Sequence, residues 1–171
     1  MAKGSRIIVT SPPRGVFEKI IVSGTPKPGT CMELKNVAAK GGRFTYEPAG
    51  TTAAVSSHGM NADGDRIGIA VLVCFADTTE CPPGKLATDA YVDGDPGCVY
   101  WPAPGEELNV LLQDHAGPAD DIVIDDKMIV DDGTGKILRS TGTVESEPFQ
   151  TRESITDPTA DQLVWCKFTG M

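Results

Sequence analysis

The sequence has few of the residues that build metal centres and nucleophilic sites. Its two histidines, His58 and His115, have no H-x-H or H-x-x-x-H partner, and no two cysteines have the C-x-x-C spacing of metal and redox sites. A G-x-S-x-G elbow and both glycine-rich phosphate loops are also missing. We therefore expect no catalytic residue, no metal and no cofactor, and a protein that is not an enzyme.

Long apolar segments are lacking as well. The longest apolar run, Ile69 to Phe75, is far too short to cross a membrane. The N-terminal residues have only three apolar residues after Arg6, which does not fit a secretory signal peptide. We expect a protein that is made in the cytoplasm and has no membrane partner.

Basic residues are outnumbered by acidic ones. The chain has 15 Lys and Arg against 24 Asp and Glu, which gives a net charge of −9. Binding to nucleic acid normally requires a basic patch that displaces counterions from phosphates. The sequence therefore predicts no direct contact with nucleic acid, and its charge suits docking on a basic protein surface.

The five cysteines are irregularly spaced and odd in number. We expect all five to be reduced, small and partly buried, as in a protein made in the cytosol. The alternative is a disulfide between Cys74 and Cys81, which would close one loop.

The sequence is rich in turn residues and short β-branched runs. It has 19 Gly and 13 Pro among 171 residues. From Asp120 to Asp132, three Asp-Asp pairs separate Ile122–Ile124 from Met128–Val130, so each run is predicted to be a strand between turns. Asn61 to Asp65 begins like a calcium loop, but Leu72 stands where the bidentate Glu is needed, so we expect a turn there.

Roughly ten short strands are predicted, at the spacing of a sandwich or barrel. We expect an all-β protein, either a compact β-barrel or β-tulip or a jelly-roll-like sandwich. Residues 1–15 should form an extended arm and residues 16–171 a single domain, with no internal repeat. Residues 87–92 fit either a helical turn or a strand. Besides the two runs above, the expected strands are Val16–Val22, Thr30–Lys35, Arg43–Glu47, Ile67–Phe75, Cys98–Trp101, Leu108–Leu112, Lys136–Arg139 and Gln162–Phe168.

Apolar residues of the arm are the main candidates for an interface. Three consecutive branched residues in an extended arm must pack on this subunit or on a neighbour, for instance by adding a strand to a sheet. The two tryptophans are core residues or, if either lies at the surface, interface anchors. The candidate interface residues are Arg6, Ile7, Ile8, Val9, Phe17 and Trp101.

Several segments together resemble the head decoration (cement) proteins of tailed bacteriophages. They are Gly24–Thr30 before an alternating strand, Asp89–Asp95 before Val99, Pro104–Leu112, Ile124–Met128 and Asp132–Leu138, with a strand closing the chain. The resemblance covers residues 16 to 169 and is carried by turns and alternating strands. Two features depart from the family pattern: the chain has five cysteines, and the segment 143–159 is unusually polar.

The resemblance implies a β-barrel or β-tulip that binds the outside of a phage head and stabilises it against internal pressure. Its partners would be the major capsid protein and further copies of itself, as a homotrimer. The protein would be made in the host cytoplasm and lie on the exterior of the virion. Two alternatives stay open: a carbohydrate- or receptor-binding β-sandwich of a virion, and a trimeric β-barrel nucleotide hydrolase.

Overall fold

The computed structural model describes an all-β protein, as the sequence predicts. The described residues form strands and turns, and none of them belongs to a helix that could span a membrane. The structure describes residues 6–10, 12–40, 43–49, 59–60, 66–74, 77, 85–114, 121–131, 133–140, 142, 147–158 and 160–170.

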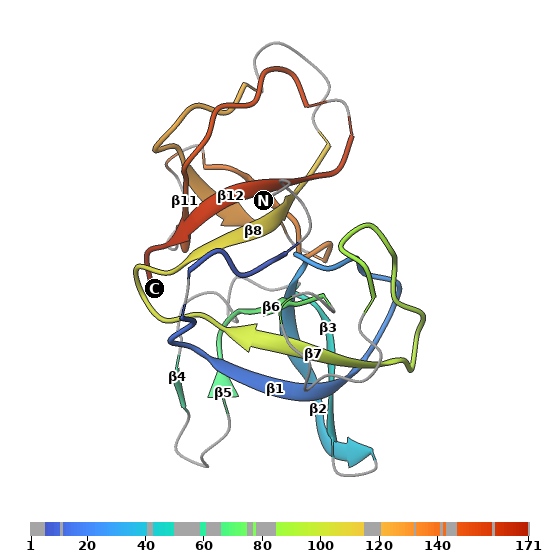
Figure 1. Ribbon diagram of the computed structural model, residues 1–171. Coiled ribbons are helices and arrows are strands. Elements are labelled where there is room, and N and C mark those ends of the chain that lie inside the picture. The colour runs from blue at the N-terminus through green and yellow to red at the C-terminus, as the bar shows by residue number, and fades with distance from the viewer. Residues whose placement is uncertain are drawn as a thin grey trace.

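Five strands of the N-terminal part close into a barrel, which we call barrel 1 (blue to lime green in Figure 1). The order around the barrel is β1-β3-β2-β6-β7, and β7 pairs with β1 to close it. Only β1 and β3 are parallel. The strands are β1 (Val16–Val22), β2 (Cys31–Lys40), β3 (Arg43–Pro48), β6 (Ala70–Leu72) and β7 (Pro96–Trp101), while β4 (Gly59–Met60) and β5 (Arg66–Ile67) form a separate two-stranded sheet.

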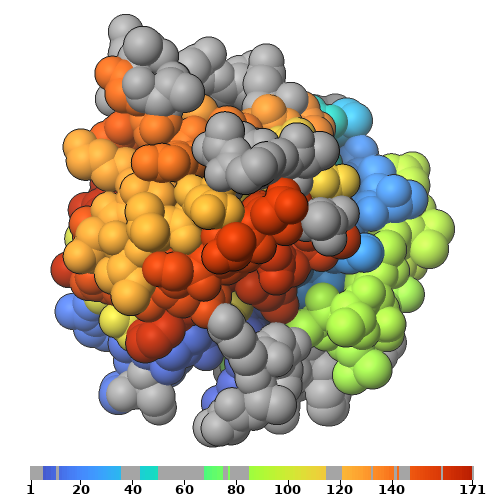
Figure 2. Space-filling view, turned by 90° about the horizontal axis from the view of Figure 1, so that it is seen from above, coloured from blue at the N-terminus to red at the C-terminus, as the bar shows by residue number. Residues whose placement is uncertain are grey.

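The remaining strands close into a second barrel, barrel 2, which lies above barrel 1 in Figure 1. Figure 2 looks down on it, with the lime-green residues that precede β7 at one side. Around barrel 2 the order is β10-β8-β12-β11-β9, and only β8 and β10 are parallel. Its strands are β8 (Glu107–Leu112), β9 (Lys127–Val130), β10 (Ile137–Arg139), β11 (Phe149–Thr151) and β12 (Gln162–Phe168).

The two barrels have the same topology. In each, the first and third strands are parallel, the second lies between the third and the fourth, and the fifth closes the ring between the fourth and the first. Strands β1, β2, β3, β6 and β7 therefore correspond in order to β8, β9, β10, β11 and β12. The prediction of one barrel or sandwich over residues 16–171, without an internal repeat, missed this division.

The strand registers correspond as well. Extending the residue pairs from Val22 around barrel 1 leads back to the level of Arg14, just before β1, and the same steps from Leu112 around barrel 2 lead back to the level of Pro104, just before β8. The two barrels therefore have the same strand stagger. Equivalent interior residues, barrel 1 first, are Ile20 and Val110, Val22 and Leu112, Met32 and Met128, Tyr46 and Ile137, Ala70 and Phe149, Leu72 and Thr151, Val99 and Cys166, and Trp101 and Phe168.

Side chains fill both barrels. Every interior residue in these pairs is buried, and all but Thr151 are apolar or aromatic. The barrels also share a core, because the outward-facing Cys31, Val71, Cys98 and Tyr100 of barrel 1 cluster with interior residues of barrel 2. The two barrels are thus packed together by apolar contacts.

Most predicted strands are present, and β1 and β12 have the predicted bounds. The strand predicted at Ile122–Ile124 is wrong, because Ile122 forms only an isolated bridge and Ile124 lies in a turn. Asp125, with a φ of 72°, reverses the chain there in spite of the β-branched run. Residues 87–92, left open between helical turn and strand, form neither: they contain a turn at Ala87–Thr88 followed by chain without regular secondary structure.

Candidate functional site

The arm residues predicted as an interface are partly packed within the chain. Ile7 and Ile8 are only 0% and 7% exposed, whereas Val9 is 40% exposed and Arg6 is also exposed. In Figure 1 the dark blue arm runs between β8 and barrel 1. The interpretation of Ile7 and Ile8 as surface contact residues is therefore corrected, because their side chains belong to the core of this chain.

The arm completes the wall of barrel 2. Strand β8 pairs with β10 only at Leu112, and the arm occupies the same edge of β8 nearer its start. Ile8 forms an antiparallel bridge with Leu108, and the N–H of Asn109 donates to the carbonyl of Ile7 at 2.7 Å. The arm thus adds a strand to the sheet edge within its own chain.

One carboxylate holds the arm in this position. Asp77 accepts hydrogen bonds from the backbone N–H groups of Ile7 and Ile8, both at 2.8 Å, and from that of Cys74 at 3.0 Å. Hydrogen bonds to an ionised acceptor are stronger than neutral ones. The arm is therefore anchored from both barrels: by Asp77, next to barrel 1, and by β8.

Trp101 and Phe17, the other predicted interface residues, belong to barrel 1. Trp101 is buried and its indole N–H donates to Glu18 at 2.9 Å, a carboxylate that also accepts from the Tyr46 hydroxyl at 3.0 Å. Phe17 is half-buried and its ring packs against Tyr100, with centroids 4.9 Å apart. Trp101 is thus a core residue, and its prediction as an interface residue is corrected.

A buried acid fastens the connection between the barrels. Glu106 is completely buried and accepts hydrogen bonds from the Tyr100 hydroxyl at 2.7 Å and from the N–H groups of Arg14 at 2.5 Å and Ala103 at 2.6 Å. Burial and the hydrogen bond to Glu106 both raise the pKa of Tyr100. Because donors from its own chain surround it, this carboxylate has a structural role.

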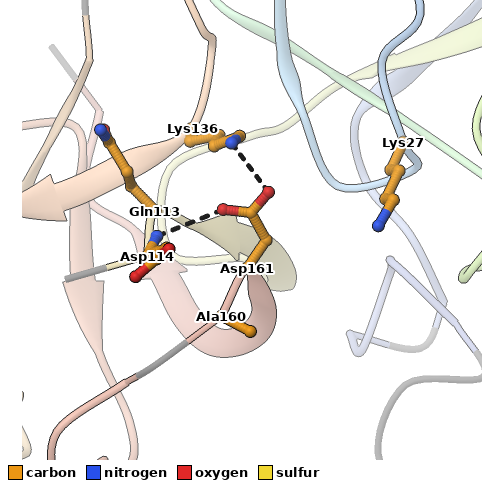
Figure 3. Close-up of a pocket in the computed structure, with 6 residues that line it drawn as sticks. All are labelled: Lys27, Gln113, Asp114, Lys136, Ala160 and Asp161. Carbon is orange, nitrogen blue, oxygen red and sulfur yellow. Dashed lines mark hydrogen bonds and ion pairs between the residues drawn. The ribbon is translucent and has the colours of Figure 1, made fainter. Parts of the chain in front are cut away.

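A polar cleft lies where the barrels meet (Figure 3). Its volume is about 480 Å³, and it shares Lys27 and Asp161 with a second hollow of about 390 Å³. Lys136 forms an ion pair with Asp161 at 2.7 Å, and the Asp114 N–H donates to the same carboxylate at 3.2 Å. Burial alone would raise the pKa of Asp161, but these two hydrogen bonds and the charges of Lys136 and Lys27 lower it.

The groups lining this cleft suit weak polar binding. Lys27 lies across the cleft from the ion pair, and the Gln113 side-chain oxygen is buried without a hydrogen-bond partner among the described residues. Ammonium and carboxylate groups are present in equal number, so no excess charge selects an anion or a cation. The cleft does not define a class of ligand.

Among the described residues, no three His, Cys, Asp or Glu side chains are grouped to hold a metal ion. The calcium-like loop at 61–65 and both histidines lie outside the described residues. Asp93 and Asp95 cap turns: they accept hydrogen bonds from the N–H groups of Gly24 at 2.8 Å and Val92 at 2.9 Å.

The cysteines differ from the expectation of five reduced thiols. Cys31, Cys74 and Cys166 are buried thiols outside any disulfide, but Cys98 is disulfide-bonded. The alternative of a Cys74–Cys81 disulfide is also wrong, because Cys74 does not take part in a disulfide. Burial raises the pKa of Cys31 and Cys166, which keeps both thiols protonated and unreactive.

Of the described residues of barrel 2, the exposed large apolar ones lie away from the predicted interface. Trp165 is 36% exposed on the outer wall, and Val123 and Ile124 are 50% and 57% exposed in the nearby turn. Trp165 is therefore on the surface, the case in which the sequence predicts an interface anchor. Val123 and Ile124 were missed because their run was interpreted as a strand, although the following Asp pair is typical of a turn.

No protein-family model matches this sequence, and no curated protein matches it. Function must therefore be inferred from the filled barrels, the anchored arm and the outer surface. Of these, the outer surface presents exposed apolar side chains, among them Ile124 and Trp165.

Proposed function

We propose that this chain is a capsid decoration protein, which binds the outside of a bacteriophage head with the major capsid protein as its partner. The first support is the resemblance of its turns and strands to head decoration proteins. The segments that carry the resemblance belong to both barrels: Gly24–Thr30 leads into β2, and Pro104–Leu112 includes the whole of β8.

The filled barrels are the observation that carries this proposal. Both interiors are occupied by buried side chains, among them Met32 and Tyr46 in barrel 1 and Met128 and Phe149 in barrel 2. A barrel packed in this way offers its outer surface, and not its interior, for recognition. A rigid body that binds through its surface is what a stabilising protein of a large assembly requires.

The charge and the expected assembly are compatible with this role. A net charge of −9 favours solubility at high concentration and attraction to basic protein surfaces. Assembly as a homotrimer would engage several capsid subunits at once, so that weak individual contacts give strong binding overall. In this proposal the protein lies on the exterior of the virion.

Co-sedimentation with capsids tests the proposal. The purified chain is mixed with empty capsids assembled from the major capsid protein encoded in the same genome, and the bound fraction is measured against chain concentration. We expect saturable binding and an increase in the temperature at which the capsids disrupt. Absence of binding, together with binding to a glycan array or turnover of a nucleotide with magnesium, would favour one of the alternatives.

Deletion of the arm is not a clean test of capsid binding. Ile7 and Ile8 are core residues and the arm forms part of the wall of barrel 2. Removing residues 1–14 would expose the edge of β8 that the arm covers, so a loss of binding could reflect a loss of folding. Substitutions of exposed side chains separate the two effects.

A further inference from the structure

The chain makes the same turn before the second strand of each barrel, at 27–30 and at 123–126. In both turns, the N–H of the fourth residue donates to the carbonyl of the first at 3.1 Å. The third residue, Gly29 or Asp125, has a φ of 91° or 72°. The third and fourth residues then bond to the fourth strand, β6 or β11, at 2.7 to 3.0 Å. The two turns are therefore structurally equivalent.

In barrel 1 this turn and the wall beside it are buried against barrel 2. The carbonyl of Gly29 accepts a hydrogen bond from the N–H of Leu111 at 2.9 Å, and a Cβ on Gly29 would lie 2.5 Å from Leu163. Val73 and Cys98, on the adjacent wall, are also buried. This face of barrel 1 is thus a docking surface inside the molecule.

The equivalent face of barrel 2 is uncovered. Asp125 corresponds to Gly29, and the pair of Arg152 and Trp165 corresponds to Val73 and Cys98. The N–H of Arg152 donates to the carbonyl of Trp165 at 2.8 Å, as the equivalent pair does in barrel 1 at 3.1 Å. We call this surface the Ile124 face and define it as Val123, Ile124, Asp125, Arg152 and Trp165.

The Ile124 face is held in place by its own contacts. Arg152 and Trp165 lie opposite each other with both side chains on the outer side, because the β11–β12 register continues to them. Arg152 also pairs with Asp125 at 2.9 Å, which joins the wall to the turn. Figure 2 shows the orange residues after 121 beside the red residues after 150 on one face. A surface ordered before binding loses little entropy on binding.

The charge around this face indicates the partner. The segments 121–126 and 152–157 carry five carboxylates and one guanidinium, and the second nearby guanidinium, that of Arg139, pairs with Asp126 at 3.3 Å. An acidic rim around exposed apolar side chains complements a basic protein surface that offers an apolar pocket.

A second copy of this chain does not fit the face. Gly29 can approach the wall of barrel 2 because it has no Cβ, but Asp125 at the equivalent position carries a charged side chain. The chain also has a net charge of −9, so two copies repel each other at an acidic contact. The contact that joins the two barrels therefore cannot be repeated between chains.

We propose that the Ile124 face is the surface through which this protein docks on a basic patch of its protein partner. This inference rests on the proposed function, under which the patch belongs to the exterior of the capsid subunit. Ile124 and Trp165 supply the apolar contact, and the acidic rim supplies attraction and orientation.

Two variants that remove the apolar contact test this inference. One is Val123→Ser with Ile124→Ser, and the other is Trp165→Ala. The control replaces two apolar residues that are at least as exposed and lie in the segment before β7, Leu86→Ser with Val92→Ser. Binding to the empty capsids is measured by co-sedimentation. We expect each test variant to bind at least about tenfold more weakly, as for loss of a hot-spot residue, and the control to bind like the unchanged chain.

A charge-removing variant tests the acidic rim. Asp125→Asn is compared with Asp89→Asn, since both residues are exposed but Asp89 lies in the segment before β7, outside the Ile124 face. Binding of Asp125→Asn should weaken, and the affinity of the unchanged chain should fall as sodium chloride is raised from about 50 to 500 mM. Equal binding by both variants would contradict the electrostatic part of the inference.

The outcomes separate this inference from the proposed function. If the unchanged chain does not bind capsids, the proposed function fails and the inference fails with it. If the unchanged chain binds, but the Val123/Ile124 and Trp165 variants bind equally well, the inference alone is wrong. Thermal unfolding of each variant at the temperature of the unchanged chain establishes that a loss of binding is not a loss of folding.

Discussion

Barrels 1 and 2 share their strand order, strand directions and register, but they use the same outer face differently. In barrel 1 the face around Gly29 and Cys98 is apolar and covered by barrel 2. In barrel 2 the equivalent face, around Asp125 and Trp165, is exposed and edged with charge. The comparison indicates that the ring of strands is a common scaffold, and that the residues on one outer face determine what each barrel contacts.

The barrel interiors differ in a compensating way. Barrel 1 has Tyr46 on its third strand and Ala70 on its fourth, whereas barrel 2 has Ile137 and Phe149 at these places. The large aromatic side chain is thus on the third strand in barrel 1 and on the fourth strand in barrel 2, and both barrel interiors are filled. Cores tolerate such substitutions when the total side-chain volume is kept. Since all but one of the equivalent interior positions carry different residues, the common topology does not appear as a repeat of these residues in the sequence.

Of the substitutions that test the comparison, we expect the largest loss of stability at the one pair of equivalent interior positions that has the same residue in both barrels. Met32 and Met128 are both fully buried. Met32→Ala and Met128→Ala should each reduce the free energy of unfolding by about 2–5 kcal/mol, because each leaves a cavity in a filled barrel. Chemical denaturation measures both. A loss below about 1 kcal/mol in only one variant would show that the two sites are not equivalent.

The next largest loss of stability is expected in the turn before the second strand, where barrel 1 has Gly29 and barrel 2 has Asp125. Gly29→Asp should cost about 2–4 kcal/mol, because the new side chain meets Leu163 and Leu111 and an L-residue is strained at a positive φ. Asp125→Gly is the matched control, and we expect a change within about 1 kcal/mol, since the exposed ion pair with Arg152 contributes little. Equal losses of unfolding free energy in the two variants would contradict the conclusion that the face around Gly29 is covered and the face around Asp125 is exposed.

Among the described residues the arm has no counterpart in barrel 1, where β1 and β3 pair directly over three residues. Asp77→Ala leaves the N–H groups of Ile7 and Ile8 without their acceptor and should cost about 1–3 kcal/mol. Amide hydrogen exchange of Ile7 and Ile8 should accelerate, while that of Val164 in β12 should change less. Unchanged protection of the arm would show that β8 alone holds it.

Much of the fold could be predicted from local pattern. Alternation and turn residues identified β1 and β12 with their bounds, because each strand has one face in a core and its ends at turns. The division into two barrels could not be predicted, since it depends on which strand edges close on each other. Val22 pairs with the parallel strand β3, and Leu112 pairs with the parallel strand β10. The local sequence around either residue gives no sign of this partner.

The candidate surfaces were predicted less well, for a related reason. The apolar side chains of Ile7, Ile8 and Trp101 suit an interface and a core equally. Packing of the arm against β8 decides for Ile7 and Ile8, and closure of barrel 1 decides for Trp101. Ile124 has a β-branched side chain, but the turn made by Asp125 exposes it. Exposure of an apolar residue is thus a property of the packed chain.

The smallest loss of stability is expected for a substitution in the cleft, where Asp161 forms an ion pair with Lys136. Because its pKa is lowered on folding, the ionised carboxylate stabilises the chain above its usual pKa of about 3.9. Asp161→Asn should therefore be less stable by under about 1 kcal/mol at pH 7. The difference should disappear as the pH falls through the lowered pKa, because the carboxyl of the unchanged chain then becomes protonated. Denaturation at pH 7 and at successively lower pH measures this, and a difference that grows on acidification would show that the ion pair does not stabilise the folded chain.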